Sequence, residues 1–137
     1  NLTLLKSLAK IDTASGTIQT NTIRPLQGSS PVLFNIDASY TKDWKVVESI
    51  FTLSYNLYGS RLWSVGIQEM GDVYENSVNT LNFTMRNNIN GEWGINLAVK
   101  NILNPTYKTT QRMIDKTVIL NEYKRGINIG LGVSYNF

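Results

Sequence analysis

The last twelve residues of the chain alternate strictly between two kinds of side chain. From Ile127 to Phe137 every odd-numbered residue is apolar or aromatic, and from Gly126 to Asn136 every even-numbered residue is small or polar. Because neighbouring residues of a strand point to opposite faces of a sheet, this pattern predicts a strand with one apolar and one polar face. The strand is long enough to cross a bilayer, which takes about 9–11 residues of a tilted strand.

Earlier segments of the chain carry the same alternation. The clearest are 46–58, in which Phe51, Leu53 and Tyr55 alternate with polar residues, and 92–102, which begins with Trp93 and Ile95 on one face. The first segment is the least regular, because its apolar residues fall on both faces. The predicted strands are 2–11, 32–40, 46–58, 80–88, 92–102 and 126–137.

The connections between these strands alternate in length. Short turns are predicted at 41–45 and at 89–91, where Asn90-Gly91 is a strong hairpin signal. The links at 12–31, 59–79 and 103–123 are long. Outer-membrane barrels have short periplasmic turns and long extracellular loops. We therefore predict an all-β fold, namely a segment of an antiparallel up-and-down transmembrane β-barrel, with the long links facing the outside of the cell.

Aromatic residues gather near both ends of the predicted strands. Two aromatic bands with aliphatic residues between them are typical of the two interfaces of a membrane. The predicted interface residues are Tyr40, Trp44 and Trp93 near the short turns, and Tyr55 and Tyr58 near the long links. The alternative is a soluble sheet or enzyme with ordinary core aromatics.

Polar residues occupy the opposite face of the predicted strands. In a membrane barrel this face points into the lumen, where side chains line a solute path or pair with a plug. The candidate lumen-facing residues are Asp37, Arg86, Asn96 and Lys100.

Six strands are too few to close a membrane barrel, because the smallest bacterial barrels have about eight. An open sheet in lipid would leave the backbone groups of its edges unpaired. We therefore expect the chain to be the C-terminal part of a larger barrel. It begins at Asn1 and shows no charged-then-apolar leader, so we expect no signal peptide in it and a cut or boundary at Asn1.

The composition argues against several other functions. The chain contains no His and no Cys, which removes the usual catalytic triads and zinc sites. Asp72 and Glu75 are the closest carboxylates in a link, and we expect them to be solvated or to form a weak cation site rather than to be catalytic. The 13 basic residues are interleaved with 10 acidic ones, so nucleic-acid binding is not expected despite a net charge of +3. We predict no enzyme activity, no cofactor and no bound metal.

Several short segments resemble the C-terminal barrel region of TonB-dependent outer-membrane receptors, and together they span nearly all of the chain. Residues 24–28 and 30–35 resemble the place in that family where a loop leads into a strand. Residues 55–61 resemble the end of the strand that follows in the family. Segment 72–75 is similar to an acidic-aromatic stretch of the following loop. Asn101-Ile102-Leu103-Asn104-Pro105 is similar to the family's N-L-F-N type of strand end, and 123–126 stands where Tyr-x-Pro-Gly-Arg is usual, without the Pro.

The resemblance implies a role in active nutrient uptake. In this family a large barrel in the outer membrane of a Gram-negative bacterium encloses an N-terminal plug, and TonB supplies energy through that plug. The partners it implies are outer-membrane lipid, the rest of the barrel and plug, and TonB through the plug, with a surface lipoprotein as a further candidate. The alternative is a receptor-like barrel with a structural or assembly role in an outer-membrane complex. A plug with a TonB-contacting segment would favour transport over that role.

The end of the chain is a candidate signal for the barrel-assembly machinery. An edge strand with a free backbone and an apolar face can add to the edge of another sheet. The residues assigned to this signal are Phe137, Tyr135 and Val133. The alternative is that Phe137 only anchors its strand at the membrane interface. Among the residues of the long links, Arg61, Trp63, Tyr74, Tyr107 and Arg112 are candidates for ligand or partner binding.

Overall fold

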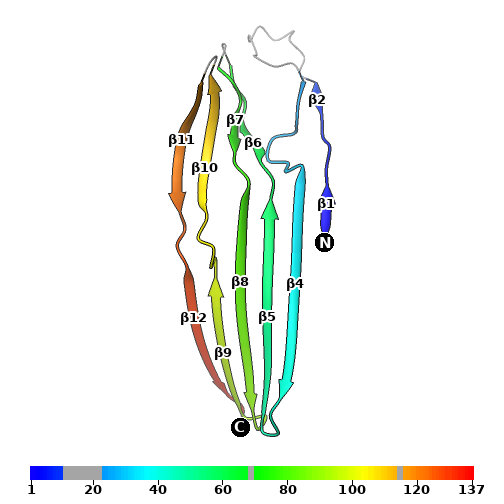
Figure 1. Cartoon of the computed structure of the whole chain (residues 1–137), viewed down its shortest axis with the longest axis vertical. Coiled ribbons are helices and arrows are strands. Elements are labelled where there is room, and N and C mark those ends of the chain that lie inside the picture. The colour runs from blue at the N-terminus through cyan, green and yellow to red at the C-terminus, as the bar shows by residue number, and fades with distance from the viewer. Residues whose placement is uncertain (11–22, 68–69, 114–115) are drawn as a thin grey trace. The chain divides into compact units, whose positions relative to one another are not determined.

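A computed structural model describes residues 1–10, 23–67, 70–113 and 116–137. The regular elements of these residues are strands, and their pairings are antiparallel, so the predicted all-β antiparallel fold is confirmed (Figure 1). In chain order the strands are β1 (Leu2–Leu4), β2 (Ala9–Lys10), β3 (Ile23–Arg24), β4 (Val32–Asp43), β5 (Val47–Tyr58), β6 (Arg61–Ser64), β7 (Val73–Glu75), β8 (Val78–Ile89), β9 (Trp93–Lys100), β10 (Thr106–Met113), β11 (Lys116–Lys124) and β12 (Asn128–Tyr135).

The chain divides into two compact units. The first contains Asn1–Phe34, Leu57–Val78 and Thr106–Lys124, and the second contains Asn35–Asn56, Asn79–Pro105 and Arg125–Phe137. The longest sheet has the strand order β1-β4-β5-β8-β9-β12. A four-stranded sheet has the order β11-β10-β7-β6, and β2 pairs with β3.

The six predicted strands correspond to the six strands of the longest sheet, but the described residues contain six further strands that were not predicted as separate strands, and the first predicted strand is wrong in extent. The five segments predicted as strands from 32 onward overlap β4, β5, β8, β9 and β12, whose ends differ from the prediction by at most three residues. The first predicted strand, 2–11, is instead β1 and β2 with an irregular stretch between them, and Ile11 lies outside the described residues. The links 59–79 and 103–123 contain the four strands β6, β7, β10 and β11. Of the link 12–31, residues 12–22 lie outside the described part, and the rest contains β3.

Both predicted short turns are hairpin turns. Asn90 and Gly91 have φ of 54° and 76°, and the Glu92 amide donates to the Ile89 carbonyl at 3.1 Å. Positive φ at both central residues is what a type I′ turn requires, and Asn and Gly adopt it at little cost. In the other turn Lys45 has a φ of 63°, and the Trp44 amide donates to the Val47 carbonyl.

The register of the second unit places the alternating residues on common faces. Leu131 pairs directly with Leu97, which pairs with Met85. Because directly opposed residues point the same way, the odd-numbered apolar residues of β12, β9 and β8 lie on one face. Ring contacts extend this face across the sheet, since Phe51 of β5 stacks with Phe83 and with Tyr40 of β4, both at 6.5 Å between centroids.

The buried apolar side chains all belong to the first unit. Among the residues that the structure describes, they are Leu62, Val73, Val78 and Tyr107. The same unit holds a buried ion pair in which Arg24 Nη1 lies 3.0 Å from Asp72 Oδ1, and both side chains are 3% exposed. The same carboxylate oxygen accepts the Gly66 amide at 2.8 Å. This ion pair ties β3 to the β6–β7 hairpin.

Two asparagines hold the start of the last strand. The Asn101 side chain donates to the Gly126 carbonyl at 2.7 Å, and the Asn104 side chain accepts the Gly126 amide at 3.0 Å. Asn101, Asn104 and Gly126 all have positive φ, which Asn and Gly tolerate best. The Asn101 amide also donates to Asn82 Oδ1. The segment that carries the N-L-F-N resemblance is thus a turn that clasps the chain just before β12.

We expect Asn101→Ala to lower the free energy of unfolding by about 2 kcal/mol, because it removes a part-buried hydrogen bond and leaves a residue with a Cβ but no polar group at positive φ. Chemical denaturation of the full protein measures this loss. The matched control is Asn88→Ala, at an exposed strand position, which we expect to change stability by less than about 0.5 kcal/mol. Equal losses in the two variants would contradict the clasp.

Candidate functional site

The apolar face of the second unit has no layer packed against it. Ser49 is the one buried residue of this unit among those described. On β12, Ile129 and Leu131 are 70% and 73% exposed. A sheet in water normally buries its apolar face against a second layer. This surface is therefore the part of the described chain that most clearly requires a partner or an apolar surrounding.

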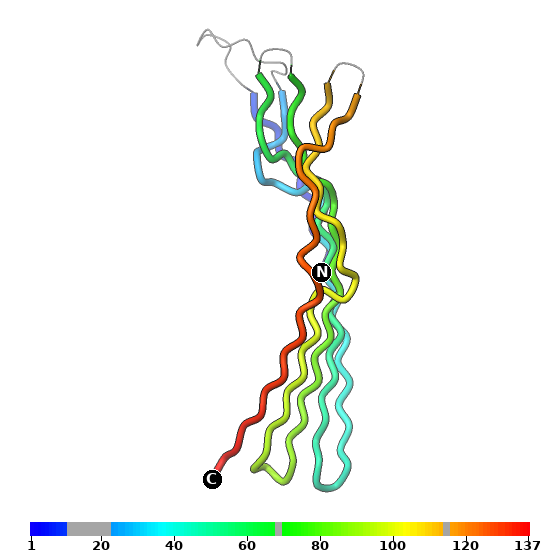
Figure 2. The backbone as a smooth tube through the Cα atoms, turned by 90° about the vertical axis from the view of Figure 1, so that its left-hand side faces the viewer, coloured from blue at the N-terminus to red at the C-terminus, as the bar shows by residue number. Residues whose placement is uncertain are grey.

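Aromatic side chains mark one end of that sheet. The β4–β5 turn, the β8–β9 turn and the C-terminus lie at the same end (Figures 1 and 2). The Asn90 amide joins the two turns by donating to the Val46 carbonyl at 2.8 Å. Trp93 contacts Tyr135 with 4.7 Å between ring centroids, and Lys42 Nζ lies 5.5 Å from the Trp44 ring. Tyr40, Trp44 and Trp93 are thus gathered where they were expected, and their role at a membrane interface stays a prediction.

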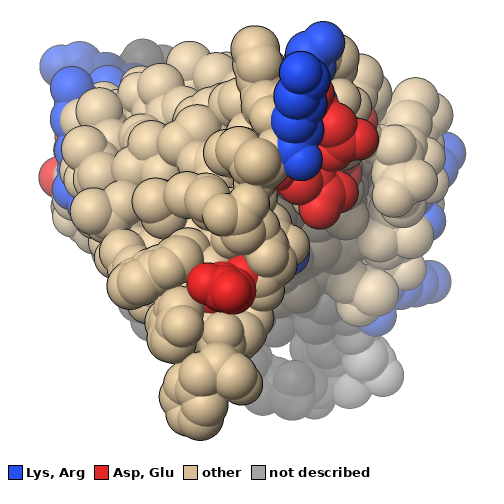
Figure 3. Space-filling model, turned by 90° about the horizontal axis from the view of Figure 1, so that it is seen from below, with Lys and Arg blue, Asp and Glu red and all other residues tan. Residues whose placement is uncertain are grey.

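The surface at the short-turn end is mostly uncharged. Viewed from that end, acidic and basic groups lie next to one another among uncharged residues (Figure 3). Asp43, Lys45 and Glu48 surround a small polar hollow there. Tyr55 and Tyr58 lie at the other end of β5, where Tyr55 is within 3.4 Å of the Asn79 side chain.

Among the strands that the structure describes, the last one pairs along one edge only. β12 pairs with β9 from Asn128↔Lys100 to Tyr135↔Trp93, and it is the end of the strand order. The Asn136 amide continues this pairing by donating to the Glu92 carbonyl at 2.8 Å. All eight residues of β12 are exposed, as are the candidate assembly residues Val133, Tyr135 and Phe137. The other edge of β12 is available to another strand.

The candidate lumen-facing residues lie on the other face. Arg86 pairs with Asn96 in the register, and Arg86 Nε donates to Asn96 Oδ1 at 3.3 Å. Lys100 is four residues beyond Asn96 in β9, an even separation, so it shares this face. On β4, Asp37 lies three residues before Tyr40, whose ring marks the apolar face. Because this separation is odd, Asp37 points to the polar face. All four are exposed.

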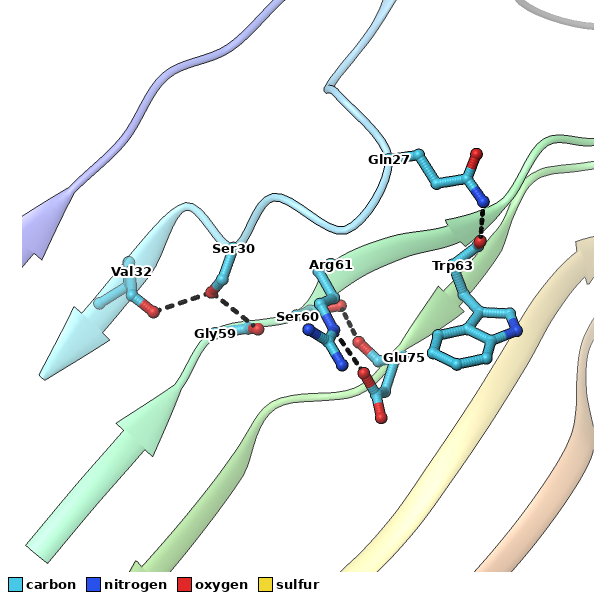
Figure 4. Close-up of polar contacts among 8 residues, drawn as sticks. All are labelled: Gln27, Ser30, Val32, Gly59, Ser60, Arg61, Trp63 and Glu75. Carbon is cyan, nitrogen blue, oxygen red and sulfur yellow. Dashed lines mark hydrogen bonds and ion pairs between the residues drawn. The ribbon is translucent and has the colours of Figure 1, made fainter.

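The residues proposed for ligand binding divide between the faces of the four-stranded sheet. Arg61 pairs with Glu75, and the two side chains form an ion pair (Figure 4). Tyr74 precedes Glu75 in β7, so its side chain points to the opposite face of the sheet. Arg112 follows Gln111 in β10 and likewise points away from the face of Gln111. The Asp72 and Glu75 carboxylates do not form a joint site, because Asp72 is held by Arg24 and Glu75 by Arg61.

The sequence reasoning missed the pairing of Arg24 with Asp72 and the pairing of Tyr107 with Tyr123. Each pair joins residues far apart in the chain, and no local pattern marks them. The stacked tyrosine rings have 5.2 Å between their centroids and 12° between their planes, and both line a groove of the four-stranded sheet.

Comparison with protein-family models, with curated proteins and with solved structures finds no match for this chain. Among the described residues there is no helix with the length and apolar character of a membrane-spanning helix. The described residues also contain no group of three or more acidic side chains that could hold a metal ion.

Proposed function

We propose that this chain is the C-terminal part of the transmembrane barrel of a TonB-dependent outer-membrane receptor. The observation that carries the proposal is the uncovered apolar face of the second unit. Lipid provides a surrounding in which that face needs no second protein layer. The long strands, of twelve residues each in β4, β5 and β8, suit a bilayer crossing.

The free edge of β12 supports the same proposal. In lipid an unpaired strand edge costs several kcal/mol for each unsatisfied backbone group. We infer that further strands of the same protein pair with β12 and with the other end of the strand order, so that the sheet closes. The aromatic end of the sheet then lies at the periplasmic interface, and the polar face with Arg86 and Asn96 lines the lumen.

Nutrient uptake by the whole protein follows from the family resemblance. In this proposal the chain contributes barrel wall, and the plug and its TonB contact lie elsewhere in the protein. A receptor-like scaffold would use the same strands. The presence of a plug with a TonB-contacting segment in the full protein separates the two roles.

Labelling of single cysteines tests the membrane placement. The chain has no native Cys, so residues of β12 can be replaced one at a time in a cysteine-free form of the full protein in vesicles. A polarity-sensitive label at Ile129→Cys, Leu131→Cys or Val133→Cys is expected to report lipid. The same label at Gly130→Cys or Gly132→Cys is expected to report a polar surrounding. An aqueous signal at all five positions would contradict the proposal.

Deletion of Phe137 is expected to lower the amount of the full protein in the outer membrane several-fold. Phe137 ends the exposed apolar face of β12, and its ring centroid lies 6.3 Å from that of Tyr135. Its loss therefore weakens the strand that would add to the assembly machinery. Quantitative immunoblotting of outer-membrane fractions measures the change. Replacement by Trp or Tyr is the matched control and is expected to preserve the level. Unchanged levels after deletion would remove the recognition role from Phe137.

A further inference from the structure

A groove of about 440 Å³ lies on one face of the four-stranded sheet β11-β10-β7-β6. This volume is within the range of small-molecule sites, about 300–1,000 Å³. The groove belongs entirely to the first unit. The residues that matter for its chemistry are Trp63, Ser64, Glu75, Leu120, Asn121 and Tyr123.

Two β-bulges form opposite sides of the groove. Leu62 pairs with Tyr74 and Ser64 with Val73, so Trp63 is an extra residue in β6. In β11 the pairing skips Leu120 between Ile119 and Asn121. A bulge redirects a side chain out of the regular alternation, and bulges are frequent beside binding sites. Here both extra residues line the groove.

Two aromatic rings offer their surfaces to the groove. Tyr107 is buried and stacks on Tyr123, which is 42% exposed. Trp63 is 53% exposed, and its indole projects from β6 beside Glu75 (Figure 4). Exposed rings at fixed positions stack against flat apolar surfaces of a ligand.

The charged groups of the groove are already compensated. The Glu75 carboxylate accepts from Arg61 Nε. Lys108 is next to Thr109 in β10, so its side chain points to the opposite face of the sheet, where Nζ lies 3.3 Å from Glu122 Oε1. A ligand with a net charge in the groove would have to disrupt the Arg61–Glu75 pair. Hydrogen-bond donors and acceptors are still offered by the Arg61–Glu75 pair and by the side chains of Ser64, Thr109 and Asn121. The groove therefore suits a neutral ligand that carries many hydroxyl groups.

A second hollow of about 420 Å³ adjoins the other side of Trp63. It is lined by Gln27, Gly28 and the four residues of β6, Arg61–Ser64. The Gln27 side chain donates to the Trp63 carbonyl at 2.6 Å (Figure 4). The Gly28 amide donates to the Leu62 carbonyl at 2.8 Å. These bonds fix the strand that carries the indole. Trp63 and Ser64 line both hollows, which therefore form two adjacent subsites, as a ligand of repeated rings requires.

We propose that this groove binds a neutral oligosaccharide. A pyranose ring has an apolar face of C–H groups that stacks on Trp63 or Tyr123, and a rim of hydroxyl groups that bonds to the amide, hydroxyl and ion-pair groups of the groove. The inference goes beyond barrel formation and depends only on side chains of the first unit. It holds whether or not the second unit lies in lipid.

Calorimetric titration of the full protein with two neutral probes, maltohexaose and cellohexaose, tests the proposal. At least one of them is expected to bind with a Kd below about 1 mM, a threshold that corresponds to weak but specific binding. Hexagalacturonate, a charged oligosaccharide of similar length, is expected to bind more weakly. Trp63→Ala and Tyr123→Ala are each expected to weaken the binding by about tenfold, and Trp63→Phe by less.

Ile119→Ala is the matched control. Ile119 is 50% exposed and Leu120 is 51% exposed, and they are neighbours on β11, but Ile119 pairs with Thr110 on the opposite face. Leu120→Ala is expected to weaken binding and Ile119→Ala to leave it unchanged. The proposal is overturned if neither neutral probe binds, if hexagalacturonate binds best, or if Trp63→Ala and Ile119→Ala have the same effect. Cysteine labelling on β12 is read separately, so a failure of the groove and a failure of the membrane placement are distinguishable.

Discussion

Leu131→Arg is expected to destabilise the full protein in lipid by about 2–4 kcal/mol. Leu131 lies in the middle of β12, is 73% exposed, and pairs with Leu97 on the apolar face. An arginine at the lipid-facing midplane of a barrel costs about this amount, because its charge must leave water. Urea unfolding of the protein in vesicles measures the loss.

The neighbouring residue provides the control for this prediction. Gly130 lies on the opposite face, and a Cβ placed there meets no atom within 4 Å. Gly130→Arg is therefore expected to cost less than about 1 kcal/mol. If the apolar face were in water, Leu131→Arg would change stability by less than about 0.5 kcal/mol, as exposed substitutions usually do. Near-equal effects of the two arginines would therefore contradict a lipid-facing β12.

Arg24→Met is expected to lower the free energy of unfolding by about 3–5 kcal/mol. It leaves the buried carboxylate of Asp72 without its arginine, and breaking one side of a buried ion pair typically has a cost of this size. Thermal or chemical unfolding of the full protein checks the value. The effect belongs to the first unit and does not depend on lipid.

Two further variants show whether burial causes this loss. Arg61→Met breaks the Arg61–Glu75 pair, in which the arginine side chain is 40% exposed, and we expect it to cost less than about 1 kcal/mol. Arg24→Met combined with Asp72→Leu removes both buried charges, and we expect it to recover much of the stability lost by the single variant. A double variant as unstable as Arg24→Met would show that the ion pair itself, and not the uncompensated charge, provides the stability.

Most of the second unit could be predicted from the sequence, because its strands alternate over most of their length. β9 and β12 keep one parity of apolar residues throughout, β5 does so from Phe51 to Leu57, and Asn90-Gly91 marks the turn between β8 and β9. A regular period of two is the strongest signal that a strand carries. The face shared by Arg86, Asn96, Lys100 and Asp37 follows from the same alternation.

The strands of the long links were missed for a physical reason. The bulges at Trp63 and Leu120 shift the parity of β6 and β11, so the alternation that identifies a strand is broken at those residues. β10 consists mostly of polar residues and shows no apolar period. The groove could not be foreseen, because it depends on which strands pair. The signals that pointed to it were the aromatic residues Trp63 and Tyr107, which the sequence offered as candidates for ligand or partner binding and which both line the groove.

The intact mass of the native protein, extracted in detergent from washed outer membranes, tests the central proposal most directly. The proposal predicts that the protein stays in the membrane until detergent is added and has a mass several times 15.4 kDa, enough for the remaining strands and a plug. A chain of 15.4 kDa extracted from the membrane would favour a sheet completed by other proteins, as in the scaffold alternative. Recovery of the protein in the soluble fraction without detergent would contradict the proposal.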